Sequence, residues 1–215
     1  MLKDFQISFL KNNMPFFNKL NKEQQQWFVD NSIYTTIKTT NSNYMSEKEC
    51  TGLIIVVNGS LRAFLDSPEG KEITLYKLLQ GDTCIFTASC IFNNINFNVN
   101  VEAIEDTEVI ILPSNYLDFL SKNNIDFQEY LLQLTQSKMS DVMYIVEQIL
   151  FTSFDKRLKE YLLEFNVPII EITHNTIAKD LGTAREVVSR MLKHFEKEGM
   201  IKTSRGIIEI VDLNK

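Results

Sequence analysis

The chain has 215 residues, of which 44% are hydrophobic and 23% charged, with only 7 glycines and 4 prolines. This composition excludes collagen-like, low-complexity and disordered proteins. The formal net charge is −6, which, taken over the whole chain, argues against nucleic acid or an anionic membrane as a partner.

Other whole-chain features point to a cytoplasmic protein. The longest apolar run, Leu53–Val57, is far shorter than the roughly 20 residues that a membrane-spanning helix requires. An acid, Asp4, stands where a signal peptide has an apolar core. Three cysteines are an odd number, which fits reduced thiols better than a disulfide framework. We therefore expect a cytoplasmic location and no membrane partner.

The charge is unevenly distributed along the chain. Residues 1–150 hold 11 basic and 18 acidic side chains, whereas residues 151–215 hold 11 basic and 10 acidic ones. Within residues 173–206 the count is 7 basic against 4 acidic, a balance of +3. The chain is thus an acidic body with a locally basic end, and its net charge does not describe that end.

The first half is predicted to be β-structure between about Tyr34 and Leu112. Asn58-Gly59 lies between two apolar runs, and this dipeptide predicts a β-hairpin with a type I′ turn. A second turn at 67–70 leads into a strand over 72–78. Many short strands joined by tight turns indicate a barrel or sandwich.

Two more strands are expected before the period changes. Phe97, Val99, Val101 and Ala103 alternate with polar residues, which is typical of a strand with one buried face. The last strand covers 108–112.

A helical pattern follows. Apolar and small residues recur at intervals of three and four, as in a helix that packs along a partner helix. These residues are Leu132, Thr135, Met139, Val142, Val146 and Ile149. From spacing alone, the same stripe fits equally well against the core of the β-domain.

The C-terminal third is predicted to be a winged helix-turn-helix. Helices are expected over 155–165, 173–181 and 184–197, with Gly182 between the last two. Two short strands around a turn are expected over 201–211. Two short helices joined by a tight turn, followed by a hairpin, form this DNA-binding motif.

Four side chains at the start of the last helix suit the reading of base edges. Arg185, Glu186, Ser189 and Arg190 share one helix face. Arginine pairs with guanine O6 and N7, glutamate accepts from cytosine N4, and serine serves several bases. The alternative is structural: Glu186 stands three residues after Thr183, as in a capping box, and the arginines are then solvated charges.

The C-terminal sequence closely resembles the helix-turn-helix of the CRP/FNR transcription regulators. The resemblance is carried by Thr173–Lys193, which reads THNTIAKDLGTAREVVSRMLK, and continues through 195–201 and 204–207. It implies an α+β fold with a double-stranded, jelly-roll-like β-roll, a long dimerisation helix and a winged helix-turn-helix. The implied boundaries are 1–122 for the β-roll with N-terminal helices, 123–150 for the helix and 151–215 for the DNA-binding domain.

The resemblance also implies how the protein acts. It favours a homodimer that binds palindromic double-stranded DNA with a TGA-like core in each half-site, and it favours the dimer contact for the stripe 132–149. Half-sites about 34–36 Å apart follow from a dimer axis. RNA polymerase is an expected partner if the protein is an activator. The implied DNA-binding residues are Thr173, His174, Thr183, Arg185, Glu186, Ser189, Arg190, Lys193 and Arg205.

The sensor half departs from the cyclic-nucleotide-binding pattern. The corresponding stretch is Gly81-Asp82-Thr83-Cys84-Ile85-Phe86, with Ile85 and Phe86 in place of a glycine and a glutamate. There is no arginine between Arg62 and Arg157 to pair with a cyclic phosphate. We therefore expect an effector other than cAMP.

The cysteines and histidines bear on other cofactors. A four-cysteine iron–sulfur cluster is not expected from three cysteines. Haem stays open, although both histidines lie in the DNA-binding part. Cys84 and Cys90 form a candidate redox pair or two small buried hydrophobes, and their spacing matches no zinc motif.

Two other functions remain as alternatives. One is a haem- or thiol-based redox or gas sensor of the same fold, and the other a ligand-binding module that acts mainly through protein partners. An enzyme is not expected, because no P-loop, dinucleotide fingerprint or catalytic triad pattern is present.

Overall fold

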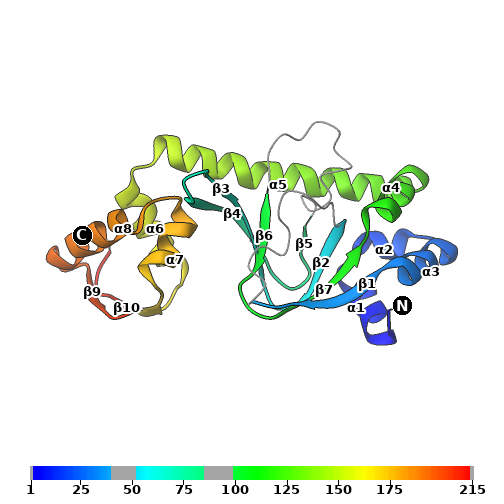
Figure 1. The fold of residues 1–215 in the computed structure, drawn as a ribbon, viewed down its shortest axis with the longest axis horizontal. Helices are drawn as coiled ribbons and strands as arrows, with labels where there is room; N and C mark the ends of the chain where they lie inside the picture. Colours follow the sequence, from blue (N-terminus) through cyan, green and yellow to red (C-terminus); the bar gives the residue numbers. More distant parts are fainter. Residues whose placement is uncertain (1, 40–51, 85–98, 214–215) are drawn as a thin grey trace. The chain divides into compact units, whose positions relative to one another are not determined.

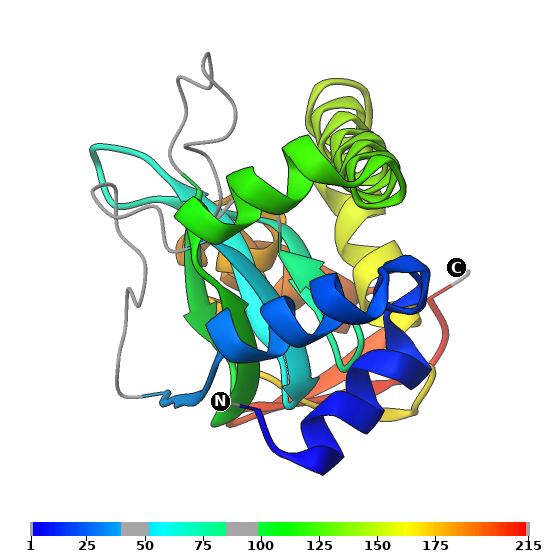
Figure 2. The ribbon, with the colours of Figure 1, turned by 90° about the vertical axis from the view of Figure 1, so that its right-hand side faces the viewer.

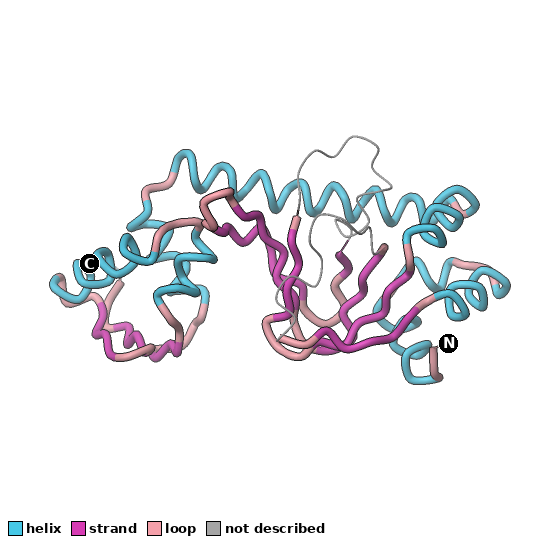
Figure 3. Tube along the Cα trace, viewed as in Figure 1, coloured by secondary structure: helices cyan, strands magenta, loops and turns pink. Residues whose placement is uncertain are grey.

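The structure is a computed structural model that describes residues 2–39, 52–84 and 99–213. It divides into two compact units. The N-terminal unit comprises Met1–Phe64 and Leu75–Asp141, and the C-terminal unit comprises Leu65–Thr74 and Val142–Lys215. Figures 1 and 3 show helices and strands in both units, which confirms the α+β class.

Four of the described helices lie within the N-terminal unit, and a fifth, α5, begins there and continues into the C-terminal unit. They are α1 (Asp4–Asn13), α2 (Pro15–Lys19), α3 (Lys22–Asn31), α4 (Ser114–Asn123) and the long α5 (Ile125–Phe151). Local signals set their beginnings: Pro15 opens α2 at its first position. Asn21 caps α3 by accepting a 2.8 Å hydrogen bond from the backbone N–H of Gln24.

Two sheets form the β-roll. The first has the strand order β1-β7-β2-β5, and the second has the order β4-β3-β6. The strands are β1 (Ile33–Ile37), β2 (Leu53–Asn58), β3 (Leu61–Asp66), β4 (Glu72–Leu78), β5 (Thr83–Cys84), β6 (Asn100–Ala103) and β7 (Thr107–Leu112). Of the alternating positions, Phe97 lies outside the described residues.

Strand β2 shows why its sequence is an unbroken apolar run. Leu53, Ile55 and Val57 belong to the core cluster that packs against the N-terminal helices. The intervening Ile54 and Val56 are also fully buried, so both faces of the strand are covered. Figure 2 shows the N-terminal helices, in blue, beside this sheet.

The prediction of a β-hairpin at Asn58-Gly59 is wrong. Strand β2 pairs with β7 and β5, whereas β3 lies in the other sheet between β4 and β6. Gly59 has the expected positive φ of 91°, but Asn58 is not among the residues with positive φ, so the turn is not type I′. The dipeptide instead turns the chain from one sheet to the other. The second predicted turn, at 67–70, does join paired strands, β3 and β4.

Gly59 is expected to be intolerant of a side chain. A Cβ atom at Gly59 would lie 2.7 Å from Thr107 Oγ1 and 2.9 Å from Thr107 Cα, and its φ is strained for other residues. Gly59→Ala should therefore lower the free energy of unfolding by about 1–3 kcal/mol. Urea unfolding followed by the fluorescence of the single tryptophan, Trp27, measures this in the N-terminal unit. The control is Gly81→Ala, because Gly81 has the same φ of 91° but its nearest neighbour atom is 3.9 Å away. Equal losses in both variants would contradict the steric explanation.

The C-terminal unit packs three helices against a small sheet. The helices are α6 (Phe154–Glu164), α7 (His174–Leu181) and α8 (Arg185–Lys197), and the strands are β8 (Ile169–Glu171), β9 (Ile201–Ser204) and β10 (Ile207–Ile210). Their shared core includes Leu158, Ile177, Leu192, Phe195 and Ile208. The predicted helices and the β9–β10 hairpin are confirmed.

Strand β8 was not expected from the sequence. It pairs antiparallel with β10, so the sheet has the order β8-β10-β9. A strand of three residues is too short to show a period of two, and its partner lies almost 40 positions further along the chain.

Candidate nucleic-acid interface

The turn between α7 and α8 is tight and formed by local hydrogen bonds. Thr173 caps α7 by accepting from the backbone N–H of Thr176 at 3.1 Å. Gly182 ends α7 in the left-handed conformation, with φ of 64°. The backbone N–H of Thr183 then donates to the carbonyl oxygen of Ala178 at 3.0 Å. Only residues 182–184 separate the two helices, as a helix-turn-helix requires.

Helix α8 has a buried face and an exposed polar face. Val188, Leu192 and Phe195 are buried in the core of the C-terminal unit. The candidate base-reading residues occupy the other side: Arg185, Glu186 and Arg190 are exposed, and Ser189 is partly exposed. Lys193 is also exposed, one turn beyond Ser189. The helix therefore presents two guanidinium groups, a carboxylate, a hydroxyl and an ammonium group on its outer surface.

The capping box that the sequence allows does not form. The N-cap of α8 is Ala184, and no side chain caps the helix. Glu186 lies in the first turn, and its backbone carbonyl accepts a 3.4 Å hydrogen bond from Arg190 Nε. The Glu186 carboxylate is thus not used as a cap of α8.

The remaining candidates lie around this helix. Thr173 and His174 stand at the start of α7, and Thr183 lies in the turn. Arg205 is exposed in the turn between β9 and β10, next to Gly206, whose φ is 75°. The structure therefore brings the predicted set to three places in one unit: the start of α7, the outer face of α8 and the wing tip.

A carboxylate on α8 fixes the wing. Glu196 Oε1 accepts hydrogen bonds from the backbone N–H of Thr203 at 2.9 Å and from its hydroxyl at 3.0 Å. These two hydrogen bonds lower the pKa of Glu196 from its ordinary value of 4.5. Sequence inspection missed Glu196 because the contact needs the chain to fold back at 199–201.

Removing this carboxylate is expected to destabilise the C-terminal unit in a pH-dependent way. Because the pKa is lowered in the folded state, the stabilisation is fully present above 4.5 and is lost as the pH falls through the lowered value. Glu196→Ala should therefore lower the melting temperature at pH 7, and this loss should become smaller as the pH falls below 4.5. Thermal unfolding by circular dichroism measures it, with Glu198→Ala, at the exposed end of α8, as control. A loss that is independent of pH would contradict the role of the ionised carboxylate.

Helix α6 supports the turn through partly buried polar contacts. The Tyr161 hydroxyl donates to Asp180 Oδ2 at 2.7 Å, and burial together with the Asp180 charge raises the pKa of Tyr161. Arg157 Nη1 donates to the carbonyl oxygen of Leu181 at 3.0 Å, and burial lowers the pKa of this guanidinium. These residues hold the end of α7, although Tyr161 looks like one of several apolar positions of α6 in the sequence.

A second candidate surface lies on α5. Leu132, Met139, Val146 and Ile149 are exposed by 40–63%, so they do not pack in the core of this chain. Thr135 and Val142 are partly exposed. The structure adds Met143 and Leu150 to the exposed stripe, at 55% and 66%. Their spacing from Met139 and Val146 is four residues, a signal that the predicted set overlooked.

Two side chains of the sensor half that bear on its effector, Arg62 and Cys84, lie in the interior. Arg62 is 4% exposed, and its Nη1 pairs with Glu102 at 2.6 Å while its guanidinium lies 4.3 Å from the centre of the Phe64 ring. Cys84 is buried, with its Sγ 4.0 Å from the Tyr76 hydroxyl. Cys90, the second member of the candidate redox pair, lies outside the described residues, as do Ile85 and Phe86.

The described residues contain neither a metal-binding cluster nor a membrane-spanning helix. No group of three or more histidine, cysteine, aspartate or glutamate side chains in this part of the chain is arranged to hold a metal ion. None of the helices in the same ranges is long and apolar enough to cross a membrane.

The fold and the polar face of α8 define a class: a regulator with a winged helix-turn-helix attached to a β-roll by a long helix. The Crp-like helix-turn-helix domain matches residues 156–215, and the cyclic nucleotide-binding domain matches residues 44–124. The chain belongs to the CRP/FNR family of transcription regulators, and thus to DNA-binding regulators rather than enzymes.

Three similar proteins illustrate the relationship. A crystal structure of a protein from Eubacterium rectale ATCC 33656, assigned to the CRP/FNR family, is 40% identical, with a TM-score of 0.88 over 94% of this chain and 95% of that one. The cyclic AMP receptor protein of Thermus thermophilus is 26% identical over 163 residues, 74% of each chain. The c-di-GMP-responsive regulator CLP of Xanthomonas campestris is 14% identical and shares the fold, with a TM-score of 0.74 over 88% of this chain and 99% of that one.

Proposed function

We propose that this regulator binds, as a homodimer, a palindromic DNA site with a TGA-like core in each half. The observation that carries the proposal is the outer face of α8, where Arg185, Glu186, Ser189 and Arg190 lie together while the opposite face is buried. A recognition helix reads bases through side chains near its N-terminus. All four of these residues lie in the first two turns of α8.

The same proposal assigns supporting roles to the other candidates. Thr173, His174 and Thr183 suit contacts with phosphates, since the first helix of the motif crosses the DNA backbone. Lys193 and Arg205 extend the positive surface along α8 and onto the wing. We propose that residues 1–122 form the sensor, residues 123–150 the dimerisation helix and residues 151–215 the DNA-binding domain. RNA polymerase is a proposed partner if the protein activates transcription.

The exposed stripe of α5 supports the homodimer. Met139, Met143, Val146 and Leu150 follow one another on the helix surface, all exposed by 40% or more. A helix of 27 residues with such a stripe is suited to pack against its copy. The two helix-turn-helix motifs of the dimer then bind two DNA half-sites that are related by the dimer axis.

The proposed effector is not cAMP. A cyclic phosphate needs a cation in the β-roll, and Arg62 is buried and engaged with Glu102 and Phe64. Lys71 and Lys77, which could in principle replace an arginine, are exposed. Two relatives are named for different nucleotides, cyclic AMP and c-di-GMP, which is compatible with yet another effector here.

The effector proposal is tested by titration calorimetry with cAMP and by the absorption spectrum of the freshly purified protein. We expect no heat of binding at micromolar cAMP. A Soret band would assign the haem-sensor alternative, and stoichiometric cAMP binding would contradict the proposal.

The DNA proposal is tested by fluorescence anisotropy with duplexes that carry two TGA cores or the same bases scrambled. We expect the palindrome to bind at least about 1,000-fold more tightly at physiological salt. The protein–DNA complex should contain two protein chains. Equal affinity for both duplexes would overturn the proposed function.

A further inference from the structure

The tip of the β3–β4 hairpin, Leu65–Thr74, belongs to the same compact unit as the DNA-reading helices. It carries a well-made turn: the backbone N–H of Ser67 donates to the Lys71 carbonyl and that of Gly70 to the Ser67 carbonyl, both at 2.8 Å. The Ser67 hydroxyl accepts from the backbone N–H of Lys71 at 3.1 Å. Because these contacts are internal, the hairpin tip has a defined shape of its own.

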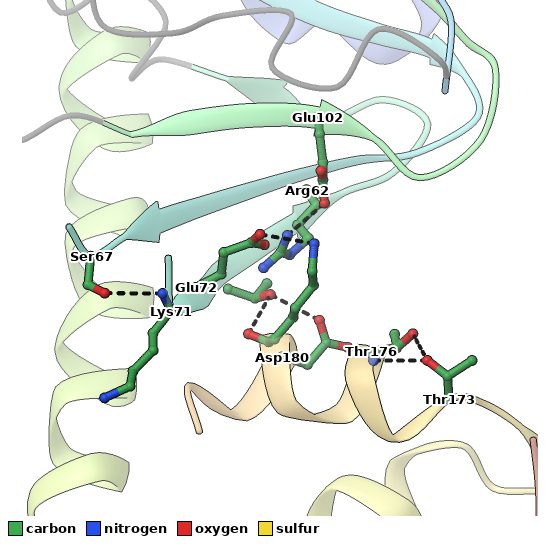
Figure 4. Close-up of polar contacts among 10 residues, drawn as sticks. Arg62, Ser67, Lys71, Glu72, Glu102, Thr173, Thr176 and Asp180 are labelled. Carbon is green, nitrogen blue, oxygen red and sulfur yellow. Dashed lines mark hydrogen bonds and ion pairs between the residues drawn. The ribbon is translucent and has the colours of Figure 1, made fainter. Parts of the chain in front are cut away.

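Three consecutive side chains of β4 contact the end of α7. Glu72 pairs with Lys179 at 3.0 Å, and both side chains are mostly covered, at 20% and 37% exposure. Thr74, which is buried, donates from its hydroxyl to Asp180 Oδ1 at 2.9 Å. Figure 4 shows Glu72 and Asp180 at this contact, with Ser67 and Lys71 at the turn.

Between these polar contacts, Ile73 lies against Gly182, which separates α7 from α8. We call these two helices, with the turn between them, the reader. A Cβ atom at Gly182 would be 2.7 Å from Ile73 Cδ1. The absence of a side chain at Gly182 thus serves both the left-handed turn and the close approach of the hairpin. Asp180 in turn accepts from Tyr161 of α6, so one carboxylate connects the hairpin with two helices.

The contact leaves the proposed DNA surface accessible. It uses residues 179–182 at the end of α7, whereas Arg185, Glu186 and Arg190 are exposed on α8. Hairpin and DNA can therefore be bound at the same time. The contact is suited to position the reader rather than to block it.

The hairpin also continues into the sensor. Upstream of the tip, residues 61–64 of β3 pair with 100–103 of β6. The reader is thus connected to the sensor twice, once along the chain through α5 and α6 and once through the hairpin tip.

We propose that Glu72, Ile73 and Thr74 act as positioning residues for DNA binding: the hairpin tip holds the α7–α8 turn and thereby preorganises the reader for a two-half-site operator. This inference rests on the proposed function, since it needs a dimer that reads two half-sites. A reader that is already ordered loses less freedom when both half-sites are engaged, so the full site is bound more tightly.

The test is a charge-exchange cycle with Glu72→Lys, Lys179→Glu and the double variant. Glu72→Lys should lower the affinity for the palindromic duplex roughly 5- to 50-fold, within the usual range of coupling between sites. The affinity for a duplex with one half-site should fall by only about the square root of that factor, roughly 2- to 7-fold, because only one reader has to be ordered there. The double variant should recover most of the lost full-site affinity relative to either single variant.

Two further variants separate the contact from general effects. Glu69→Lys makes the same charge change on the same hairpin, where Glu69 pairs with exposed Lys71, and should leave DNA affinity unchanged. Ile73→Ala keeps every charge but removes the contact with Gly182, and should also lower full-site affinity. Unchanged or higher full-site affinity in Glu72→Lys, or no recovery in the double variant, would overturn the inference.

Hydrogen exchange of residues 173–182 without DNA keeps the two proposals apart. Release of the hairpin should accelerate exchange in Glu72→Lys and restore protection in the double variant. If the unmutated protein fails to prefer the palindrome while this exchange pattern holds, the proposed DNA site is wrong but the hairpin contact stands. If the palindrome is preferred and exchange does not respond, the hairpin contact is the part that fails.

Discussion

Arg190→Ala is expected to abolish specific DNA binding. Arg190 is exposed on the outer face of α8, one turn after Glu186, where its guanidinium can form two hydrogen bonds with a guanine. Losing one bidentate contact costs about 1–3 kcal/mol, and a dimer loses it in both half-sites, so the total is roughly 2–6 kcal/mol. The preference for the palindrome over scrambled DNA should fall by at least about 30-fold.

The control for Arg190→Ala is Lys197→Ala. Lys197 is the last residue of the same helix, remote from the base-reading turns, and its substitution removes the same charge. Anisotropy titrations with palindromic and scrambled duplexes measure both variants at one salt concentration. If Arg190→Ala weakens binding to the two duplexes equally, Arg190 contacts phosphate rather than a base, and its assignment fails.

Met139→Glu is expected to separate the dimer into monomers. Met139 is 63% exposed in the single chain, near the middle of the apolar stripe of α5. In a symmetric pair of helices the two new carboxylates would be buried close to each other, at a cost of several kcal/mol. We expect the dissociation constant to rise at least about 100-fold and full-site DNA affinity to fall with it.

Sedimentation velocity over a concentration series measures this change. Ser140→Glu serves as control, because it adds the same charge at the next residue, which is exposed on another side of α5. The far-ultraviolet circular dichroism of both variants should match that of the unmutated protein. A dimer that survives Met139→Glu unchanged, or that is lost equally in Ser140→Glu, would contradict the proposed dimer surface.

The contrast between β2 and α8 shows which features local sequence predicts well. The outer and inner faces of α8 follow from a period of 3.6 residues and need no knowledge of distant residues. The Asn58-Gly59 turn looks equally strong, yet β2 pairs with β7 and β3 with β6, both far along the chain. Gly59 supplies the positive φ that the sequence indicates, while the choice of partner strand belongs to the packing of two sheets.

The candidate DNA-binding site was likewise predicted where it depends on local sequence and missed where it depends on distant residues. The residues on α8 and at the wing tip lie where the motif predicts, in one unit, because the motif is continuous in sequence. Glu196, Tyr161 and Asp180 were missed, since each acts through a partner on another element. The two extra members of the α5 stripe, Met143 and Leu150, were overlooked although their four-residue spacing is visible in the sequence, and their exposure identifies them.

The sequence by itself determined the helix-turn-helix and the hairpin that follows it, the basic end of an acidic chain and the polar face of the recognition helix. These properties depend on local periodicity, turn residues and composition, which a single sequence contains. Only the tertiary structure decided that β2 and β3 lie in different sheets, that Arg62 is engaged in the interior and that the hairpin tip reaches α7. Each of these depends on residues far apart in the chain, whose meeting is set by the packing of the whole chain rather than by their neighbours.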